Sequence, residues 1–136
     1  MPNREETLSA QKSLAQIYGV IAAFLALFGL FTVEGHLFRL LNVDTALNVL
    51  RVVLAAALLY AGFVTKNDKT IRDILMFTGV VYVTLAVLGL FNSVLWDLLP
   101  TGLTGFDVIV HLLAGALAIA VARSGQDLSK EKKPPV

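Results

Sequence analysis

Four apolar stretches run through the chain, at roughly residues 14–33, 46–64, 74–95 and 106–122. A helix rises about 1.5 Å per residue, so about 20 residues cross the ~30 Å hydrocarbon core of a bilayer. The second and fourth stretches are slightly short, which a small tilt or local thinning of the bilayer accommodates. All four are rich in Ala and Leu and lack the alternation that is typical of strands. The pattern predicts four transmembrane helices and no strands.

Polar residues mark where these helices begin and end. Asp44 or Thr45 suits the cap of the second helix, and Gly125 suits the end of the fourth. A capping box joins two residues three apart, each bonded to the other's backbone N–H, and its spacing occurs at Asn3–Glu6, Thr70–Asp73 and Thr104–Asp107.

The first half of the pattern recurs in the second half. Gly19–Phe31 aligns with Gly79–Phe91 at an offset of 60, with seven of thirteen residues identical. Thr45–Leu58 resembles Thr104–Leu117 more weakly. A cleaved signal peptide has no reason to recur inside the mature chain, so we expect the first helix to remain. The predicted fold is all-α: an integral membrane four-helix bundle made of two parallel tandem repeats of a transmembrane helix pair.

Positive charge predicts the orientation of these helices. Nine of the eleven Lys and Arg residues lie near the N-terminus, in the central loop or near the C-terminus, and the exceptions are Arg39 and Arg51. The positive-inside rule then places both termini and the central loop in the cytoplasm. Trp96 is expected near the outer interface, and Tyr18 and Tyr60 near the inner one. The predicted organisation in the cell (inner) membrane is a cytoplasmic segment 1–13, a helix-pair repeat 14–64, a cytoplasmic loop 65–73, a second repeat 74–123 and a disordered cytoplasmic tail 124–136.

Composition narrows the classes of function. Charged residues make up 15% of the chain, against about 25% in soluble domains. The net charge of +1 provides no basic face for nucleic acid, and the absence of cysteine excludes disulfides, thiolate metal sites and cysteine nucleophiles. The sequence contains no phosphate-binding glycine loop, no nucleophile elbow and no paired helix histidines. We therefore predict a protein that is not an enzyme.

Small residues four positions apart favour close helix packing, because helices in a bilayer associate through tight contacts and polar bonds. Such seams either pack the helices of one chain together or form an interface between subunits. The predicted packing residues are Gly19, Ala23, Gly79, Ala57, Ala61, Ala114 and Ala118.

Five polar residues are expected near the outer ends of the helices: Glu34, His36, Arg51, Asp107 and His111. Ionisable groups inside a membrane are costly and are candidates for function. Each also has a structural interpretation: Asp107 as the acid of its capping box, Arg51 as a counter-ion of Asp107 or Glu34 or directed toward headgroups, His111 as a core histidine, and His36 as a solvated residue. Metal ligation is disfavoured by the nearby Arg51 and by the absence of tight histidine spacing, so no metal and no cofactor are predicted.

Three segments carry a resemblance to a known family: Leu47–Arg51, Phe77–Leu90 and Asp107–Gly115. They resemble the bacterial membrane family called domain of unknown function 4383, over roughly residues 14–123. The resemblance implies a four-helix membrane protein and no established activity. The family has Asn-x-x-His in the second helix and Asp-Asn-x-x-His in the fourth. Asn48, Asp107 and His111 match this pattern, whereas Arg51 replaces a histidine and Val108 an asparagine, so a role for paired histidines is in doubt.

The leading prediction is a non-catalytic multi-pass membrane protein, either an accessory or structural subunit of a membrane complex or a small homo-oligomer. Its partners would be the lipid bilayer and other membrane subunits or copies of itself, and not nucleic acid. The first alternative is a protein that handles a small solute or protons through Arg51, Asp107 and His111. The second alternative is haem or metal binding through His111, with His36.

Overall fold

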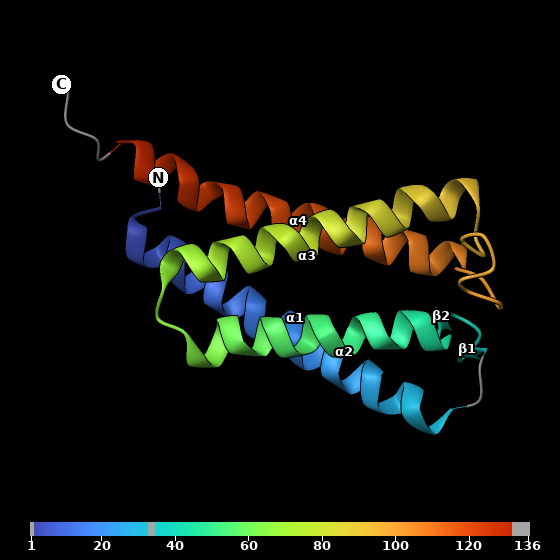
Figure 1. Cartoon of the computed structure of the whole chain (residues 1–136). Helices are drawn as coiled ribbons and strands as arrows, with labels where there is room; N and C mark the ends of the chain where they lie inside the picture. Colours follow the sequence, from blue (N-terminus) through green and yellow to red (C-terminus); the bar gives the residue numbers. More distant parts are fainter. Residues whose placement is uncertain (1, 33–34, 132–136) are drawn as a thin grey trace.

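The computed structural model describes residues 2–32 and 35–131, with side chains described as far as Gly125. This part of the chain forms four long helices: α1 (Arg4–Phe31), α2 (Thr45–Leu59) continued by a π-helical turn η1 (Tyr60–Val64), α3 (Asp68–Phe91) and α4 (Gly105–Glu131). In Figure 1, α1 and α3 run in one direction, and α2 and α4 run in the other. The start of α1, the η1–α3 connection and the end of α4 therefore share one end of the bundle. The opposite end, here called the loop end, carries residues 35–44 and 92–104.

Each of these helices is long and apolar enough to cross a membrane, by length and composition. Large apolar side chains cover the outside of the bundle, and Phe24, Phe77 and Leu113 are each more than half exposed. Exposing apolar surface to water costs about 25 cal/mol per Å², whereas lipid tails solvate it well. The surface is that of a protein compatible with a membrane.

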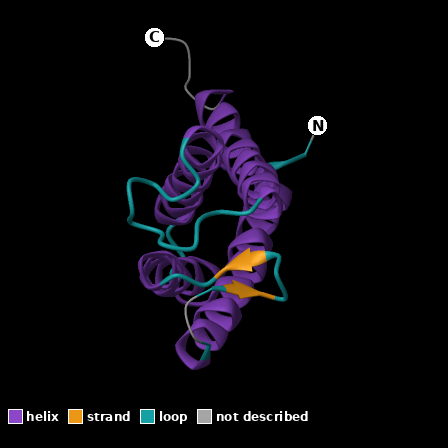
Figure 2. Ribbon diagram, turned by 90° about the vertical axis from the view of Figure 1, so that its right-hand side faces the viewer, coloured by secondary structure: helices purple, strands orange, loops and turns teal. Residues whose placement is uncertain are grey.

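A short hairpin at the loop end contradicts the prediction that the chain has no strands. β1 (His36–Leu37) pairs antiparallel with β2 (Leu41–Asn42), as Figure 2 shows in orange. Phe38 and Arg39 connect the strands with φ angles of 53° and 62°. Strands of two residues are too short to produce an alternating pattern that could be recognised in the sequence.

The capping boxes at Asn3–Glu6 and Thr104–Asp107 are confirmed, whereas the one predicted at Thr70–Asp73 is wrong. α3 begins earlier, because the Asn67 side chain accepts a hydrogen bond from the Thr70 backbone N–H at 3.1 Å. Asp73 instead pairs with Lys69, one helical turn away. Asn67 takes the cap because its side chain reaches the free N–H groups one turn ahead.

The fourth helix also extends further than predicted. The expected helix stop at Gly125 and the expected disorder from residue 124 are wrong for residues 124–131, because α4 continues to Glu131. Just before this part of α4, the side-chain Nε2 of Gln11 in α1 donates to the Val121 carbonyl at 3.1 Å. A Cβ on Gly125 would lie 2.5 Å from the same nitrogen, so glycine serves close packing here. Residues 132–136 of the predicted tail lie outside the described residues.

Two of the predicted packing residues, Gly19 and Gly79, lie between helices of the same chain. A Cβ on Gly19 would lie 3.0 Å from the Leu59 backbone nitrogen of α2, and one on Gly79 would lie 2.9 Å from the Gly115 carbonyl of α4. Glycine therefore allows the backbones of each helix pair to approach closely. Ala61 and Ala118 are fully buried, whereas Ala23, Ala57 and Ala114 are half-buried.

Candidate functional site

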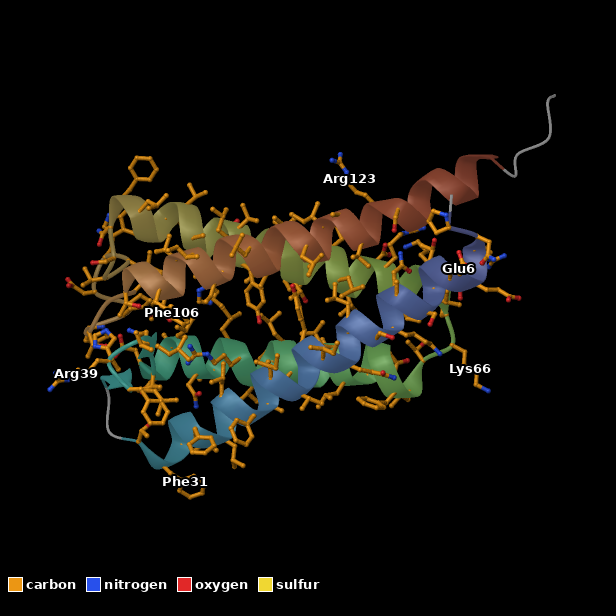
Figure 3. All side chains as sticks on the ribbon, turned by 180° about the vertical axis from the view of Figure 1, so that it is seen from behind. Glu6, Phe31, Arg39, Lys66, Phe106 and Arg123 are labelled. Atoms are coloured by element: carbon orange, nitrogen blue, oxygen red, sulfur yellow. The ribbon has the colours of Figure 1, made fainter. Side chains whose placement is uncertain are left out.

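A cavity of about 150 Å³ lies between the two helix pairs. All four helices contribute to its lining, together with Leu41 of β2. Its polar lining residues are Tyr18, Arg51, Tyr82 and His111, and the others are Leu, Ile, Val and Ala. α1 and α4 contact each other near the termini and diverge toward the loop end, as Figures 1 and 3 show from opposite sides. The cavity lies where they diverge.

Tyr18 bounds the cavity on the side of the termini. Its hydroxyl donates to the Ala114 carbonyl at 2.8 Å and so joins α1 to α4. Its ring lines the cavity. A tyrosine suits both a membrane interface and an interior with a carbonyl in reach, and the expected position of Tyr18 near the inner interface stays a prediction.

Arg51 is the least expected group in this lining. It lies six residues into α2, or about 9 Å from the start of that helix, and it is only 6% exposed. Its Nη1 atom is buried and has no hydrogen-bond partner, and no described carboxylate lies within 4.0 Å of the guanidinium. Asp107 interacts with Arg51 only through the longer-range attraction of opposite charges. Within the described residues, Arg51 is therefore not the ion-pair partner that the sequence led us to consider.

Asp107 is engaged at the loop end and does not line the cavity. Its fully buried carboxylate accepts hydrogen bonds from the Asn42 backbone N–H at 3.0 and 3.2 Å. It also accepts from the backbone N–H and the hydroxyl of Thr104, at 3.0 and 3.1 Å. These bonds cap α4 and attach β2 to it, which makes Asp107 a structural residue.

His111 lies one turn after Asp107 and faces the cavity. Its Nδ1 is 2.6 Å from the Asp107 backbone carbonyl, and a carbonyl only accepts, so Nδ1 carries the hydrogen. In a neutral imidazole this leaves Nε2 as a hydrogen-bond acceptor. Tyr82 packs edge-on against the imidazole, with ring centroids 5.2 Å apart. His111 thus makes the carbonyl bond of a core histidine and also lines the cavity.

The predicted polar cluster is divided by the structure. Arg51 and His111 line the cavity, whereas His36 is exposed at the loop end with its Nε2 3.0 Å from the Gly102 carbonyl. Glu34 lies outside the described residues. Among the residues that the structure describes, no three His, Cys, Asp or Glu side chains are grouped so that they could hold a metal ion.

A second polar group, which the sequence did not predict, lies at the loop end and is here called the loop network: Asn42, Asp44 and Thr101. The Asn42 side-chain amide donates to the Asp44 carboxylate at 2.8 Å, to the Thr101 hydroxyl at 3.0 Å and to the Gly102 carbonyl at 2.7 Å. Asp44 accepts two further bonds from Thr101, from its backbone N–H at 3.0 Å and its hydroxyl at 2.8 Å. The loop network therefore joins the connection of the first helix pair to that of the second.

Asp44 occupies the cap position of α2 without making the predicted side-chain cap bond. Burial raises the pKa of its carboxyl, but the hydrogen bonds from Asn42 and Thr101 outweigh burial and hold the pKa below its ordinary value. The two-residue spacing of Asn42 and Asp44 is one signal that could have identified this group. It is the spacing of an Asx turn, and the Asp44 N–H donates to the Asn42 side-chain oxygen at 2.8 Å.

No family model, curated protein or solved structure matches this chain. The resemblance to the domain of unknown function 4383 family stays a prediction.

Proposed function

We propose that this chain is a multi-pass membrane protein that binds a small solute in the cavity between its two helix pairs. The observation that carries this proposal is the placement of Arg51. A side chain with a fixed charge lines the cavity, nine-tenths buried, with its Nη1 atom free of hydrogen bonds in the described structure. Burying a charge without a partner costs several kcal/mol, so such groups in membrane proteins commonly serve function.

The proposal selects the solute-handling alternative and changes its residues. The proposed site keeps Arg51 and His111 and adds Tyr18 and Tyr82, which also line the cavity. Asp107 is not part of it. Ligand sites are typically concave and mostly apolar, with a few polar groups that orient the ligand, and this lining follows that composition.

The accessory-subunit or homo-oligomer role stays a prediction. It rests on the absence of enzyme motifs, on the small-residue seams and on the short loops. Two of the seam residues, Gly19 and Gly79, pack on Leu59 and Gly115 inside one chain. The non-enzymatic character and haem binding through His111 likewise stay predictions.

The proposed topology has two tandem helix pairs and both termini in the cytoplasm. Lys66 lies at the end of the bundle that carries the termini, and Arg39 lies at the opposite end (Figure 3). This distribution supports the orientation that the positive-inside rule favours. Gly19 and Gly79, which occupy equivalent places in the two repeats, each allow close approach within their own pair, which supports the repeat.

A cavity-filling variant tests the solute site. Ala22 is buried in the cavity lining, and Ala56 is exposed on α2, so Ala22→Phe and Ala56→Phe add the same volume inside and outside the cavity. We expect at least one ring-sized solute among benzoate, benzamide and benzylammonium to raise the unfolding temperature of wild type and Ala56→Phe in nanodiscs, and not that of Ala22→Phe. If no solute separates the two variants, the proposal is wrong.

A further inference from the structure

The chemistry of the cavity lining identifies the class of solute, in an inference that rests on the proposed function. We propose that the cavity binds a monoanion with an apolar body, whose oxyanion pairs with Arg51 and which enters sideways between α1 and α4. A lipid-derived or a water-soluble carboxylate would both have this chemistry.

The unpaired charge of Arg51 favours an anionic ligand. The guanidinium of Arg51 is permanently positive, and the described structure provides its Nη1 atom with no acceptor. Asp107, the carboxylate that acts on it through space, is already held by Asn42 and Thr104. A neutral ligand could accept a hydrogen bond from Arg51 but would leave its charge uncompensated. An anion accepts the hydrogen bond and also compensates the charge of Arg51. Charge-assisted hydrogen bonds are about twice as strong as neutral ones.

The shape and the other lining residues decide the rest of the ligand. Leu25, Leu47 and Leu54 provide apolar contact and offer nothing to a second charge. A cavity of about 150 Å³ admits a body of about the size of a benzene ring in another protein. His111 uses its Nδ1 hydrogen on a backbone carbonyl, and the remaining nitrogen of a neutral imidazole is an acceptor, which disfavours a second oxyanion beside it. A monoanion therefore fits better than a phosphate dianion or a dicarboxylate.

The exposed lining residues locate the entrance. Ile21 of α1 is 52% exposed and Val110 of α4 is 38% exposed, and both line the cavity. Val110 lies five residues into α4, or about 8 Å from its start, and Ile21 lies about 15 Å before the end of α1. The entrance therefore opens on the apolar flank of the bundle, between the two helices that diverge in Figure 3. A ligand that arrives there needs an apolar body.

Benzoate, its neutral isostere benzamide and hexadecanoate test this inference with the whole chain in lipid nanodiscs. Binding is followed by the shift of a ¹³C label at the carboxyl or amide carbon, with empty nanodiscs as background. We expect wild type to bind benzoate at least about tenfold more tightly than benzamide, the ratio typical of one charge-assisted contact. Arg51→Gln should remove this preference, whereas Arg39→Gln, which changes an exposed arginine on the hairpin, should keep it.

Each outcome decides between the two proposals. Tighter binding of hexadecanoate than benzoate assigns the ligand to the membrane, and the reverse assigns it to water; both support the monoanion. Benzamide binding as tight as benzoate binding, or a preference unaffected by Arg51→Gln, overturns the monoanion and leaves the solute site intact. If neither ring compound binds wild type, the solute site fails as well. Should Arg51→Gln not fold, Ala22→Phe retains the charge and fills the cavity, and continued benzoate binding by it overturns the inference.

Discussion

The loop network makes a strong prediction about stability, and Asp44 is its best point of perturbation. Asp44→Asn preserves the shape of the side chain but replaces one acceptor oxygen by an NH₂ group. At the Oδ2 position it would face two donors, Asn42 Nδ2 and the Thr101 N–H. At the Oδ1 position it faces the Thr101 hydroxyl, which can turn and accept from it. The second orientation keeps three hydrogen bonds but makes all of them neutral. Hydrogen bonds to charged groups contribute about 1.5–3 kcal/mol and neutral ones about 0.5–1.5, so we expect a loss of about 3 kcal/mol.

Trp96 provides the assay. It is the only tryptophan of the chain, and it is exposed in the loop that carries Thr101. Unfolding by dodecyl sulfate in mild detergent, followed by its fluorescence, gives the free energy of unfolding at pH 7. Asp97→Asn removes the same charge from an exposed position in this loop, and it should change stability by less than about 0.5 kcal/mol. Equal stability of Asp44→Asn and wild type would refute the assigned role of the network.

The pH dependence gives an independent check. Hydrogen bonds hold the folded-state pKa of Asp44 below its ordinary value, which is about 3.9 in an unfolded chain. The stabilisation is therefore complete above pH ~3.9 and is lost as the pH falls through the folded-state pKa. Within that window the loss is at most about 1.4 kcal/mol per pH unit. Asp44→Asn should lack this part of the acid response, and an identical response in both proteins would contradict the cause given for the shift.

Three further predictions concern packing, backbone strain and buried polarity, each measured as the free energy of unfolding in detergent. Gly79→Ala should destabilise the protein by about 1–2 kcal/mol, because its Cβ would lie 2.9 Å from a carbonyl of α4. In the control Gly105→Ala the new Cβ meets nothing within 4 Å, so this variant should not be destabilised. Equal effects of the two substitutions would contradict the contact. Arg39→Gly should stabilise the protein by about 0.5–1 kcal/mol, because glycine adopts the φ of 62° at this position without strain. Arg39→Ala keeps the strain and should not stabilise the protein. The same gain in both variants would refute strain as the cause. Thr78→Val should leave the free energy of unfolding unchanged or raise it by up to about 1 kcal/mol, since the buried Thr78 hydroxyl has no partner in the described structure. If Thr78→Val loses more stability than the exposed control Thr84→Val, the Thr78 hydroxyl is hydrogen-bonded.

Local features of the sequence were sufficient to predict the helices. The four apolar stretches became α1 to α4, and the capping boxes at both Asn3 and Thr104 formed. Helix formation depends on hydrogen bonds between residues four apart, which hydrocarbon makes obligatory, so a pattern read in a window of 20 residues is informative. The helix ends were less predictable: Asn67 replaced Thr70 as a cap, and α4 continues past Gly125 to Glu131.

The candidate site was predictable only in part. Arg51 and His111 attracted notice because ionisable residues inside apolar stretches are rare, but the sequence joined them with Asp107, His36 and Glu34 as one cluster. Their separation depends on contacts between residues more than 60 positions apart, such as Asn42 with Asp107.

Composition and periodicity determined that this chain forms long apolar helices with small-residue seams, because burial in lipid and backbone pairing act on each segment alone. The tertiary structure decided which polar groups find partners. Asp107 and Asp44 are paired by loops that only the folded bundle brings together, and the divergence of α1 from α4 leaves Arg51 facing a cavity. Whether a buried charge is satisfied depends on atoms within about 4 Å of it, and distance along the chain carries almost no information about that neighbourhood.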